Sequence, residues 1–459
     1  MASVQQSDKI NDILEGSIPA TLKRMTIPMI FGMITLMMFN LVDTFFISML
    51  GTEQLAAVSF TFPVTFTVIS LAIGLGIGTS AVIAKALGSG NIEEARFDAT
   101  VALLISAVFV FCLSIIGYLL IEPTFYLLGA NNDVMPYIYD YISVWFLGSV
   151  FLITPMIGNS VLRASGDTKT PSFIMGFAGL INAILDPLLI FGVGPFPELG
   201  IKGAAIASVI AWSVAVAIIL YLLAVKKRLL SLNPGRQGVI AASKKILKIG
   251  FPAAGANMLT PIAMAVMTAI VAKYGPEAVA AFGVGSRIES IASLVVLALS
   301  MTLPPFISQN YGAKSYDRVK EAYRTSLKFV MAFQFAVYLV LLISSGLISR
   351  TFGHEPEVIR VIELFIYIMP LSYGFQGVII LTNSSLNALH KPMNALVLSV
   401  IRLFVFYVPL AYVGSRLGGL PGLFIGAALG NLLTALVSYQ WFCRSIERMH
   451  SASLKRSMS

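Results

Sequence analysis

Long apolar stretches, separated by short polar segments, fill almost the whole of this 459-residue chain. A helix needs about 20 apolar residues to cross the roughly 30 Å hydrocarbon core of a membrane, and twelve stretches are long enough. Only 12% of the residues are charged, about half the share in a soluble domain. We therefore predict an all-α polytopic membrane protein. The twelve predicted transmembrane helices are residues 25–50, 56–84, 97–121, 135–162, 171–192, 203–225, 249–272, 278–308, 325–347, 358–388, 393–414 and 420–442.

Basic residues are distributed unequally between the predicted loops. With the N-terminus in the cytoplasm, 24 of the 31 Lys and Arg residues lie on the cytoplasmic side, five lie outside, and Arg287 and Arg402 lie within spans. Lys and Arg favour cytoplasmic loops, so both termini are predicted to be cytoplasmic. This topology, together with attraction to the anionic head groups of the lipid bilayer, accounts for the formal charge of +9. No nucleic-acid partner is expected.

The second half of the chain repeats features of the first half at an offset of 224 residues. Each half begins inside and contains an even number of spans, which predicts two six-helix lobes related by a pseudo-twofold axis along the membrane normal. We expect an N-terminal lobe at residues 1–225, a cytoplasmic linker at 226–248, and a C-terminal lobe with a basic cytoplasmic tail at 249–459. The matching pairs are Pro28 and Pro252, Gly51 and Gly275, Glu53 and Glu277, Ala56-Ala57 and Ala280-Ala281, and Gly88 and Gly312.

Two carboxyl groups interrupt the spans of the first half. Asp43 lies in the first span, where Asn40 shares its helical face and can offer an amide to it, and where Pro28 favours a kink. Asp186 lies in the fifth span, one turn after Asn182. A bare charge in hydrocarbon costs at least ~2.5 kcal/mol, so these acids must be neutralised, paired or hydrated. We predict a site for a proton or a small cation; the alternative is that each Asp serves only a hydrogen bond between helices.

Further polar and sulfur-containing side chains stand out within the spans. Arg287, Glu289 and Arg402 interrupt the spans of the second half and fit either an internal charge pair or a functional role. Met33 and Met37 belong to a methionine-rich face of the first span. Because the thioether side chain adapts to varied apolar ligands, we predict that these two residues line a substrate cavity; the alternative is that this face packs in the core or contacts lipid.

The sequence does not favour an enzyme. All three histidines fall in predicted loops or the tail, and the two cysteines show no metal-binding spacing, so no catalytic triad and no cofactor are expected. Two membrane-embedded aspartates could form an aspartyl protease pair, but the Gly-x-Gly-Asp motif is absent and the companion asparagines argue against one. The Asp-Arg-x-Gly-Arg-Arg signature of major-facilitator transporters is also absent after the second span.

Several segments together resemble the multidrug and toxic compound extrusion (MATE) transporters, and within that family the DNA-damage-inducible F (DinF) branch. The resemblance covers about residues 20–440 and includes the arrangement of twelve spans in two halves. The motifs that carry it are Pro28, NLVD at 40–43, Gly51, KALGSGNIEEAR after the second span, RASGDTKTP at 163–171 and NAILDP at 182–187.

The resemblance implies a multidrug antiporter of the bacterial inner membrane that exports amphipathic, often cationic compounds in exchange for H⁺ or Na⁺. The alternative is a flippase or exporter of a lipid-linked or amphipathic metabolite. By this resemblance, Asp43, Asn182 and Asp186 bind the proton or Na⁺, Ser208 joins them, and Asn159 lines the substrate cavity. The transporter is expected to act as a monomer.

The resemblance also implies that the first helix bends at Pro28 when Asp43 takes up a proton. The sequence departs from another bacterial branch of the family, which carries acidic residues in the seventh and tenth spans. Here the seventh span has no acidic residue, and Glu363 lies near one end of the tenth. A cation site in the C-terminal lobe is therefore not expected.

Overall fold

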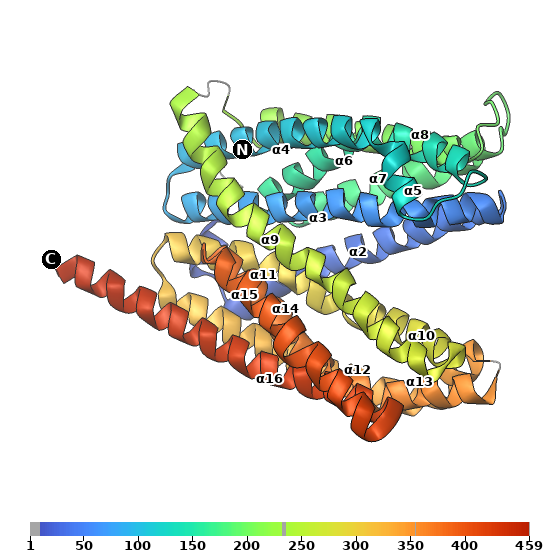
Figure 1. The fold of residues 1–459 in the computed structure, drawn as a ribbon. Coiled ribbons are helices and arrows are strands. Elements are labelled where there is room, and N and C mark those ends of the chain that lie inside the picture. Colours follow the sequence, from blue (N-terminus) through green and yellow to red (C-terminus); the bar gives the residue numbers. More distant parts are fainter. Residues whose placement is uncertain (1–9, 232–235, 354, 459) are drawn as a thin grey trace. The chain divides into compact units, whose positions relative to one another are not determined.

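The computed structural model describes residues 10–231, 236–353 and 355–458, and within these ranges it contains helices and no strands (Figure 1). The helices up to the predicted linker are α2 (Ile18–Ser48), α3 (Thr52–Gly88), α4 (Ile92–Leu119), α5 (Ile121–Leu127), α6 (Met135–Ala164), α7 (Lys169–Ile190), α8 (Ile201–Tyr221) and η1 (Leu222–Lys226). The later helices are α9 (Arg236–Val271), η2 (Ala272–Tyr274), α10 (Pro276–Ala292), α11 (Leu294–Gly312), α12 (Tyr316–Phe352), α13 (Pro356–Ile368), η3 (Met369–Ser372), α14 (Tyr373–Ala388), α15 (Pro392–Ile401), η4 (Arg402–Tyr407) and α16 (Val408–Met458).

The described helices account for the twelve predicted spans. Ten helical segments are long and apolar enough to cross a membrane, and α10 and α11, bent by 42° at their junction, form one more. The last of the ten runs for 62 residues, which is roughly three times the length needed for one crossing. Gly418 and Gly419 have non-helical backbone angles there, and Gly414 faces Gly422 so closely that neither position has room for a Cβ atom. This segment is therefore a hairpin of two spans, and the predicted all-α fold is confirmed.

The described residues group into two compact units, one formed largely by residues 27–254 and the other by residues 13–26 and 255–459. In the first unit, α6 packs against α3, α4 and α8, and α7 packs against α8. Leu75, Phe125 and Ile142 are almost completely buried in its core. The predicted boundaries of the lobes and linker remain predictions; α9 already begins at Arg236, inside the range predicted for the linker.

In the second unit, α14 packs against α11, α12 and α16. The ring of Tyr323 stacks on Phe442 with centroids 3.8 Å apart, and the Tyr323 hydroxyl is hydrogen-bonded to Thr382 at 2.7 Å. Arg318 holds the segment before α2 in this unit by donating hydrogen bonds to the carbonyl oxygens of Ile13 and Gly16 at 3.0 and 2.8 Å.

Two long helices pass from one unit into the other, and each does so beside a proline. Helix α2 changes unit between Thr26 and Ile27, next to Pro28, and α9 changes unit between Ala254 and Gly255, close to Pro252. Pro28 and Pro252 are equivalent positions of the predicted repeat. A proline inside a helix removes one backbone hydrogen bond, so both connecting helices have a local weak point where they change unit.

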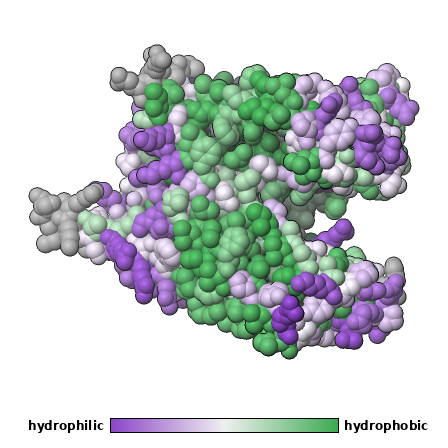
Figure 2. All heavy atoms as spheres, viewed as in Figure 1, coloured by the Kyte–Doolittle hydropathy of each residue, from purple (hydrophilic) through white to green (hydrophobic). Residues whose placement is uncertain are grey.

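The surface of each unit fits a membrane environment. Apolar side chains gather over the middle of the helices and polar side chains over their ends (Figure 2). On α12, for example, Val340, Ile343 and Leu347 are 64 to 87% exposed. Large apolar side chains exposed to this degree are stable in contact with lipid chains.

Candidate ion-coupling site

Three helices of the first unit bring the predicted acids and amides together. Helix α2 carries Asp43 one turn before its end, α7 carries Asn182 and Asp186 one turn apart, and α8 carries Ser208. The Asn182 Nδ2 atom donates hydrogen bonds to Asp186 Oδ1 and to Ser208 Oγ, both at 3.2 Å. One amide group therefore links α7 to α8 and holds the carboxyl group of Asp186 in place.

The carboxyl groups of Asp43 and Asp186 are neighbours that interact with each other. Asp186 is completely buried and Asp43 is half-buried. The Oδ1 atom of Asp43 and the Oδ2 atom of Asp186 are buried and have no hydrogen-bond donor among the described residues. Two carboxyl groups in such contact can form a hydrogen bond to one another only when one of them carries a proton, so the geometry suits proton binding.

The surroundings of the carboxyl pair are apolar. Ile47, Ile190 and Ala204 form a small buried cluster beside it. Phe46 and Phe191 pack against this cluster, and the centroids of their two rings are 6.2 Å apart. Charge is poorly solvated in such an environment, which strengthens every electrostatic interaction within it.

Sequence reasoning missed Tyr141, which lies on α6 against the same apolar cluster and interacts electrostatically with both Asp43 and Asp186. Nothing in the sequence singles it out, because a tyrosine near the end of a span is common at membrane interfaces. Its contribution follows only from the packing of α6 beside α2 and α7.

The remaining predicted residues are not part of the hydrogen-bonded group. Asn40 is exposed, and no described hydrogen bond joins its amide to Asp43. Asn159 is buried on α6, and its Oδ1 atom has no partner among the described residues. Met33 and Met37 are half-buried on α2. Roles in cargo binding for these residues remain predictions.

Helix α2 is held against α7 by few close contacts. Gly32 lies beside Ser172, and the ring of Phe39 lies directly over Gly179. Phe31, Met38 and Leu41 are 61 to 69% exposed on the remaining surface of α2. A groove of about 500 Å³ runs alongside these contacts and is lined by residues of both helices, among them Pro28, Phe31, Thr35, Phe173, Gly176 and Phe177. The helix that carries Asp43 therefore has space to move.

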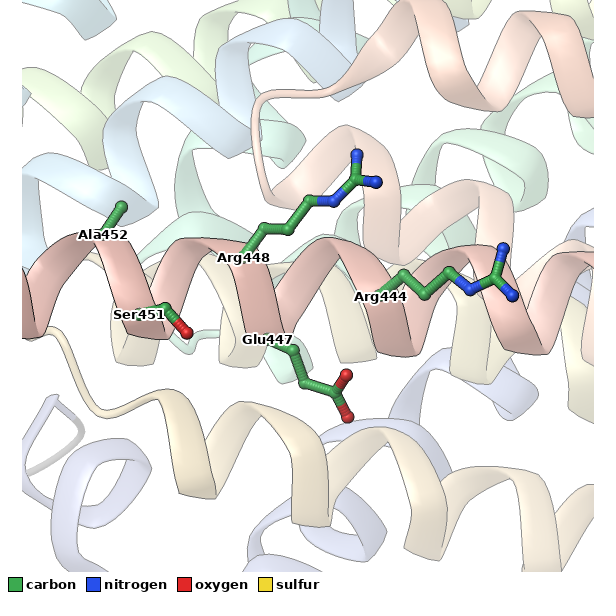
Figure 3. Close-up of a pocket in the computed structure, with 5 residues that line it drawn as sticks. All are labelled: Arg444, Glu447, Arg448, Ser451 and Ala452. Carbon is green, nitrogen blue, oxygen red and sulfur yellow. The ribbon is translucent and has the colours of Figure 1, made fainter.

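A second hollow lies on α16 and has a different character. It measures about 390 Å³, and Arg444, Glu447, Arg448, Ser451 and Ala452 line it. Figure 3 shows that all five side chains project from this one helix. A hollow formed by one helix alone is a surface depression and does not assemble groups from several elements, as the site around Asp43 does.

Comparison with known proteins identifies the family. The sequence model of the MatE family matches residues 28–188 and 252–413, well over half of the chain. The chain belongs to the MATE family. Members of this family are transporters and not enzymes, so the chain is a multi-pass membrane transporter, and the predicted family and class are confirmed.

Three similar proteins cover nearly all of this MATE transporter. A protein of Shewanella oneidensis called FAD transporter is 43% identical, over 93% of this chain and 95% of that protein. The Bacillus subtilis probable multidrug resistance protein YoeA is 26% identical, over 86% of each. The crystal structure of the Vibrio cholerae MATE transporter VcmN in the bent form has 35% identity and a TM-score of 0.91, over 95% of this chain and 98% of that one.

Proposed function

We propose that this MATE transporter drives export by exchanging cargo for protons that bind between Asp43 and Asp186. The observation that supports the proposal is the contact between their two carboxyl groups in an apolar part of the first unit. Two ionised carboxylates at this distance repel each other strongly, whereas one shared proton converts the contact into a hydrogen bond. The protonation state of the pair therefore changes the attraction between α2 and α7.

The change in attraction is converted into movement of α2. Gain or loss of the proton changes the force between α2 and α7, and Pro28 is the point at which α2 bends most easily in response. Because α2 also carries Met33 and Met37, its displacement changes the space available to cargo. The related transporter from Vibrio cholerae, whose solved structure is in a bent form, is consistent with a bending helix in this family.

A proton fits the site better than Na⁺ does. Hard cations require several oxygen ligands at once. Asn182 directs its amide nitrogen, a donor, at Asp186, so its oxygen does not join the two carboxyl groups as a ligand. Na⁺ bound by Asp43, Asn182 and Asp186 would require the amide to turn and to give up its hydrogen bonds to Asp186 and Ser208.

Two classes of cargo have support. Amphipathic and often cationic compounds are the first, since the relative from Bacillus subtilis is named a probable multidrug resistance protein. A flavin nucleotide is the second, since the relative from Shewanella oneidensis is named a FAD transporter and is 43% identical to this chain. A flavin nucleotide is an amphipathic metabolite, the type of cargo that the sequence offered as the alternative to drugs.

The test uses purified protein in proteoliposomes with an imposed pH gradient, with FAD or a fluorescent cation as cargo. We expect Asp43→Asn and Asp186→Asn each to abolish transport driven by the gradient, because neither variant can cycle between a charged and a neutral pair. The control is Asp133→Asn, which removes an exposed carboxylate before α6 and should leave the rate unchanged. An Asp43→Asn protein that unfolds at the normal temperature and still responds to the pH gradient would contradict the proposal.

A further inference from the structure

The second unit carries charged side chains deep in its apolar spans that proton exchange in the first unit does not use. Glu289 lies on α10 and Arg402 begins η4. Gln376 on α14 donates a hydrogen bond to Glu289 Oε1 at 2.8 Å, and Glu289 interacts electrostatically with Arg402. The guanidinium of Arg402 also lies 5.4 Å from the ring centroid of Tyr407. These two opposite charges therefore compensate each other inside the unit.

Arg287 has no such compensation. It lies eleven residues after the start of α10, about 16 Å along the helix, and is thus well inside the span. Its side chain is exposed, and no carboxylate of the described residues forms an ion pair with it. Residues two apart on a helix point in different directions, so Glu289 does not face it. An uncompensated charge at this depth is costly unless it faces water or an anion.

The face of α10 that precedes Arg287 carries small side chains, and a large apolar side chain appears only in the turn after it. Toward the start of the helix its exposed residues include Ala280 and Gly283, and one turn after Arg287 both Ser290 and Ile291 are exposed, Ile291 to 62%. A Cβ atom at Gly283 would meet nothing within 4 Å, so this surface is open. The exposed face of α12, by contrast, carries large apolar residues such as Val340 and Ile343. Small side chains beside an exposed guanidinium allow a flat molecule to approach the cation closely.

We propose that Arg287 binds the anionic group of the exported molecule, and that this molecule is an aromatic metabolite carrying phosphate, of the flavin nucleotide class. The inference rests on the proposed export function and adds its substrate class. A guanidinium offers several donors in one plane and forms paired hydrogen bonds with phosphate oxygens. The equivalent position in the predicted repeat is Pro63, so the anion site belongs to the second half alone.

The experiment measures KM and kcat in proteoliposomes for FAD, FMN and riboflavin, which share one ring system and differ in phosphate. We expect Arg287→Gln to raise the KM for FAD and FMN about ten- to a hundredfold, the usual effect of losing a hydrogen bond to a charged group, and to change the KM for riboflavin less than twofold. Arg287→Lys keeps the positive charge, so its KM for FAD and FMN should lie between the values of the unchanged protein and of Arg287→Gln. Arg360→Gln, which changes an exposed arginine on α13, is the control and should alter none of these values.

A second pair of variants tests the open surface without removing charge. Gly283→Leu should raise the KM for all three flavins, because a larger side chain fills the space beside Arg287. Gly346→Leu is the matched control on α12, since a Cβ atom there also meets nothing within 4 Å. Both variants should unfold at the same temperature as the unchanged protein. A rise in KM for Gly283→Leu alone would therefore report on flavin binding and not on stability.

The outcomes separate the two proposals. If the protein moves a fluorescent cation in response to a pH gradient but binds and moves no flavin nucleotide, the inference about Arg287 is wrong and the proposed antiport stands. If Arg287→Gln leaves the KM for FAD unchanged, or raises the KM for riboflavin equally, Arg287 does not recognise phosphate. If no gradient moves any of these compounds, both proposals fail.

Discussion

At the scale of single residues, Asn182 fixes the geometry of the proton site. Its amide nitrogen donates to Asp186 on its own helix and to Ser208 on α8, so one side chain sets both the position of a carboxyl group and the spacing of two helices. Asp186 retains one buried oxygen without a described donor, and so does Asp43. These two free oxygens are the acceptors available to an incoming proton.

We expect Asn182→Ala to lower the free energy of unfolding by about 1 to 3 kcal/mol, because it leaves the buried carboxyl group of Asp186 without its donor. Transport driven by a pH gradient should fall at least tenfold in the same variant. Ser208→Ala removes only the hydrogen bond to α8 and should cost about 1 kcal/mol with a smaller effect on the rate. Chemical denaturation and proteoliposome assays measure the two effects. Equal losses in both variants would mean that Asn182 acts only as a link between helices.

Part of this site could be predicted from the sequence and part could not. Asp43, Asn182 and Asp186 stand out because polar side chains within apolar spans are rare, and the structure places them together. Asn40 was expected to offer its amide to Asp43 because it lies three residues earlier on α2, yet its side chain is exposed. Helical spacing shows which residues share a face, but the neighbouring helices decide which part of that face is buried.

At the scale of helices, α2 combines a loose fit with two fixed points. Its first turns are held in the second unit, where the Thr26 hydroxyl is hydrogen-bonded to Thr302 at 2.8 Å. Its later turns lie against α7 in the first unit, where Gly179 allows the ring of Phe39 to approach the α7 backbone. Pro28 lies between these two regions. A helix held at separate places and weakened between them can change its bend without losing either contact.

The contact at Gly179 predicts a difference between two neighbouring glycines of α7. A Cβ atom at Gly179 would lie 2.1 Å from Phe39 Cδ2, whereas a Cβ atom at Gly176 would lie at an ordinary 3.5 Å from Thr35 Cγ2. We expect Gly179→Ala to push α2 away from α7, to separate Asp43 from Asp186, and to reduce proton-driven transport at least tenfold. Gly176→Ala should leave transport unchanged. Transport rates in proteoliposomes test this prediction. Equal rates for the two variants would show that the contact between Phe39 and Gly179 does not control the distance between Asp43 and Asp186.

The positions of the spans could be predicted from the sequence, but one bend within a span could not. All twelve spans follow from apolar length, and the turn after α2 matches its repeat, because Gly51 and Gly275 both adopt positive φ before the next helix. The bend between α10 and α11 was not predicted, since Ala292 and Ser293 carry no helix-breaking signal. There the broken turn is stabilised from outside by Gln334, which donates a hydrogen bond to the Ala292 carbonyl oxygen at 2.9 Å.

At the scale of the whole molecule, the charge of the cargo determines how much work the membrane potential contributes. Each elementary charge that crosses 100 mV contributes about 2.3 kcal/mol, enough for a concentration ratio of roughly fifty. Exchange of one proton for one monovalent cation moves no net charge, so only the pH difference drives it. FAD carries two negative charges on its pyrophosphate, so its export in exchange for one proton moves three charges in the favourable direction.

This difference yields a prediction that joins the proton site to the anion site. Three charges across 100 mV supply about 7 kcal/mol, so FAD efflux from proteoliposomes should accelerate several-fold when a K⁺ diffusion potential makes the interior negative, even without a pH difference. Asp43→Asn should abolish this acceleration, because the proposed FAD export requires a proton in exchange. A passive leak of FAD would still respond to the potential in this variant, so the variant separates transport from leak. Arg287→Gln should preserve the voltage response at saturating FAD while raising the concentration required. An efflux rate that does not change with the potential would show that the exported form of the cargo is not an anion. Arg287 would then not bind an anionic group of the cargo.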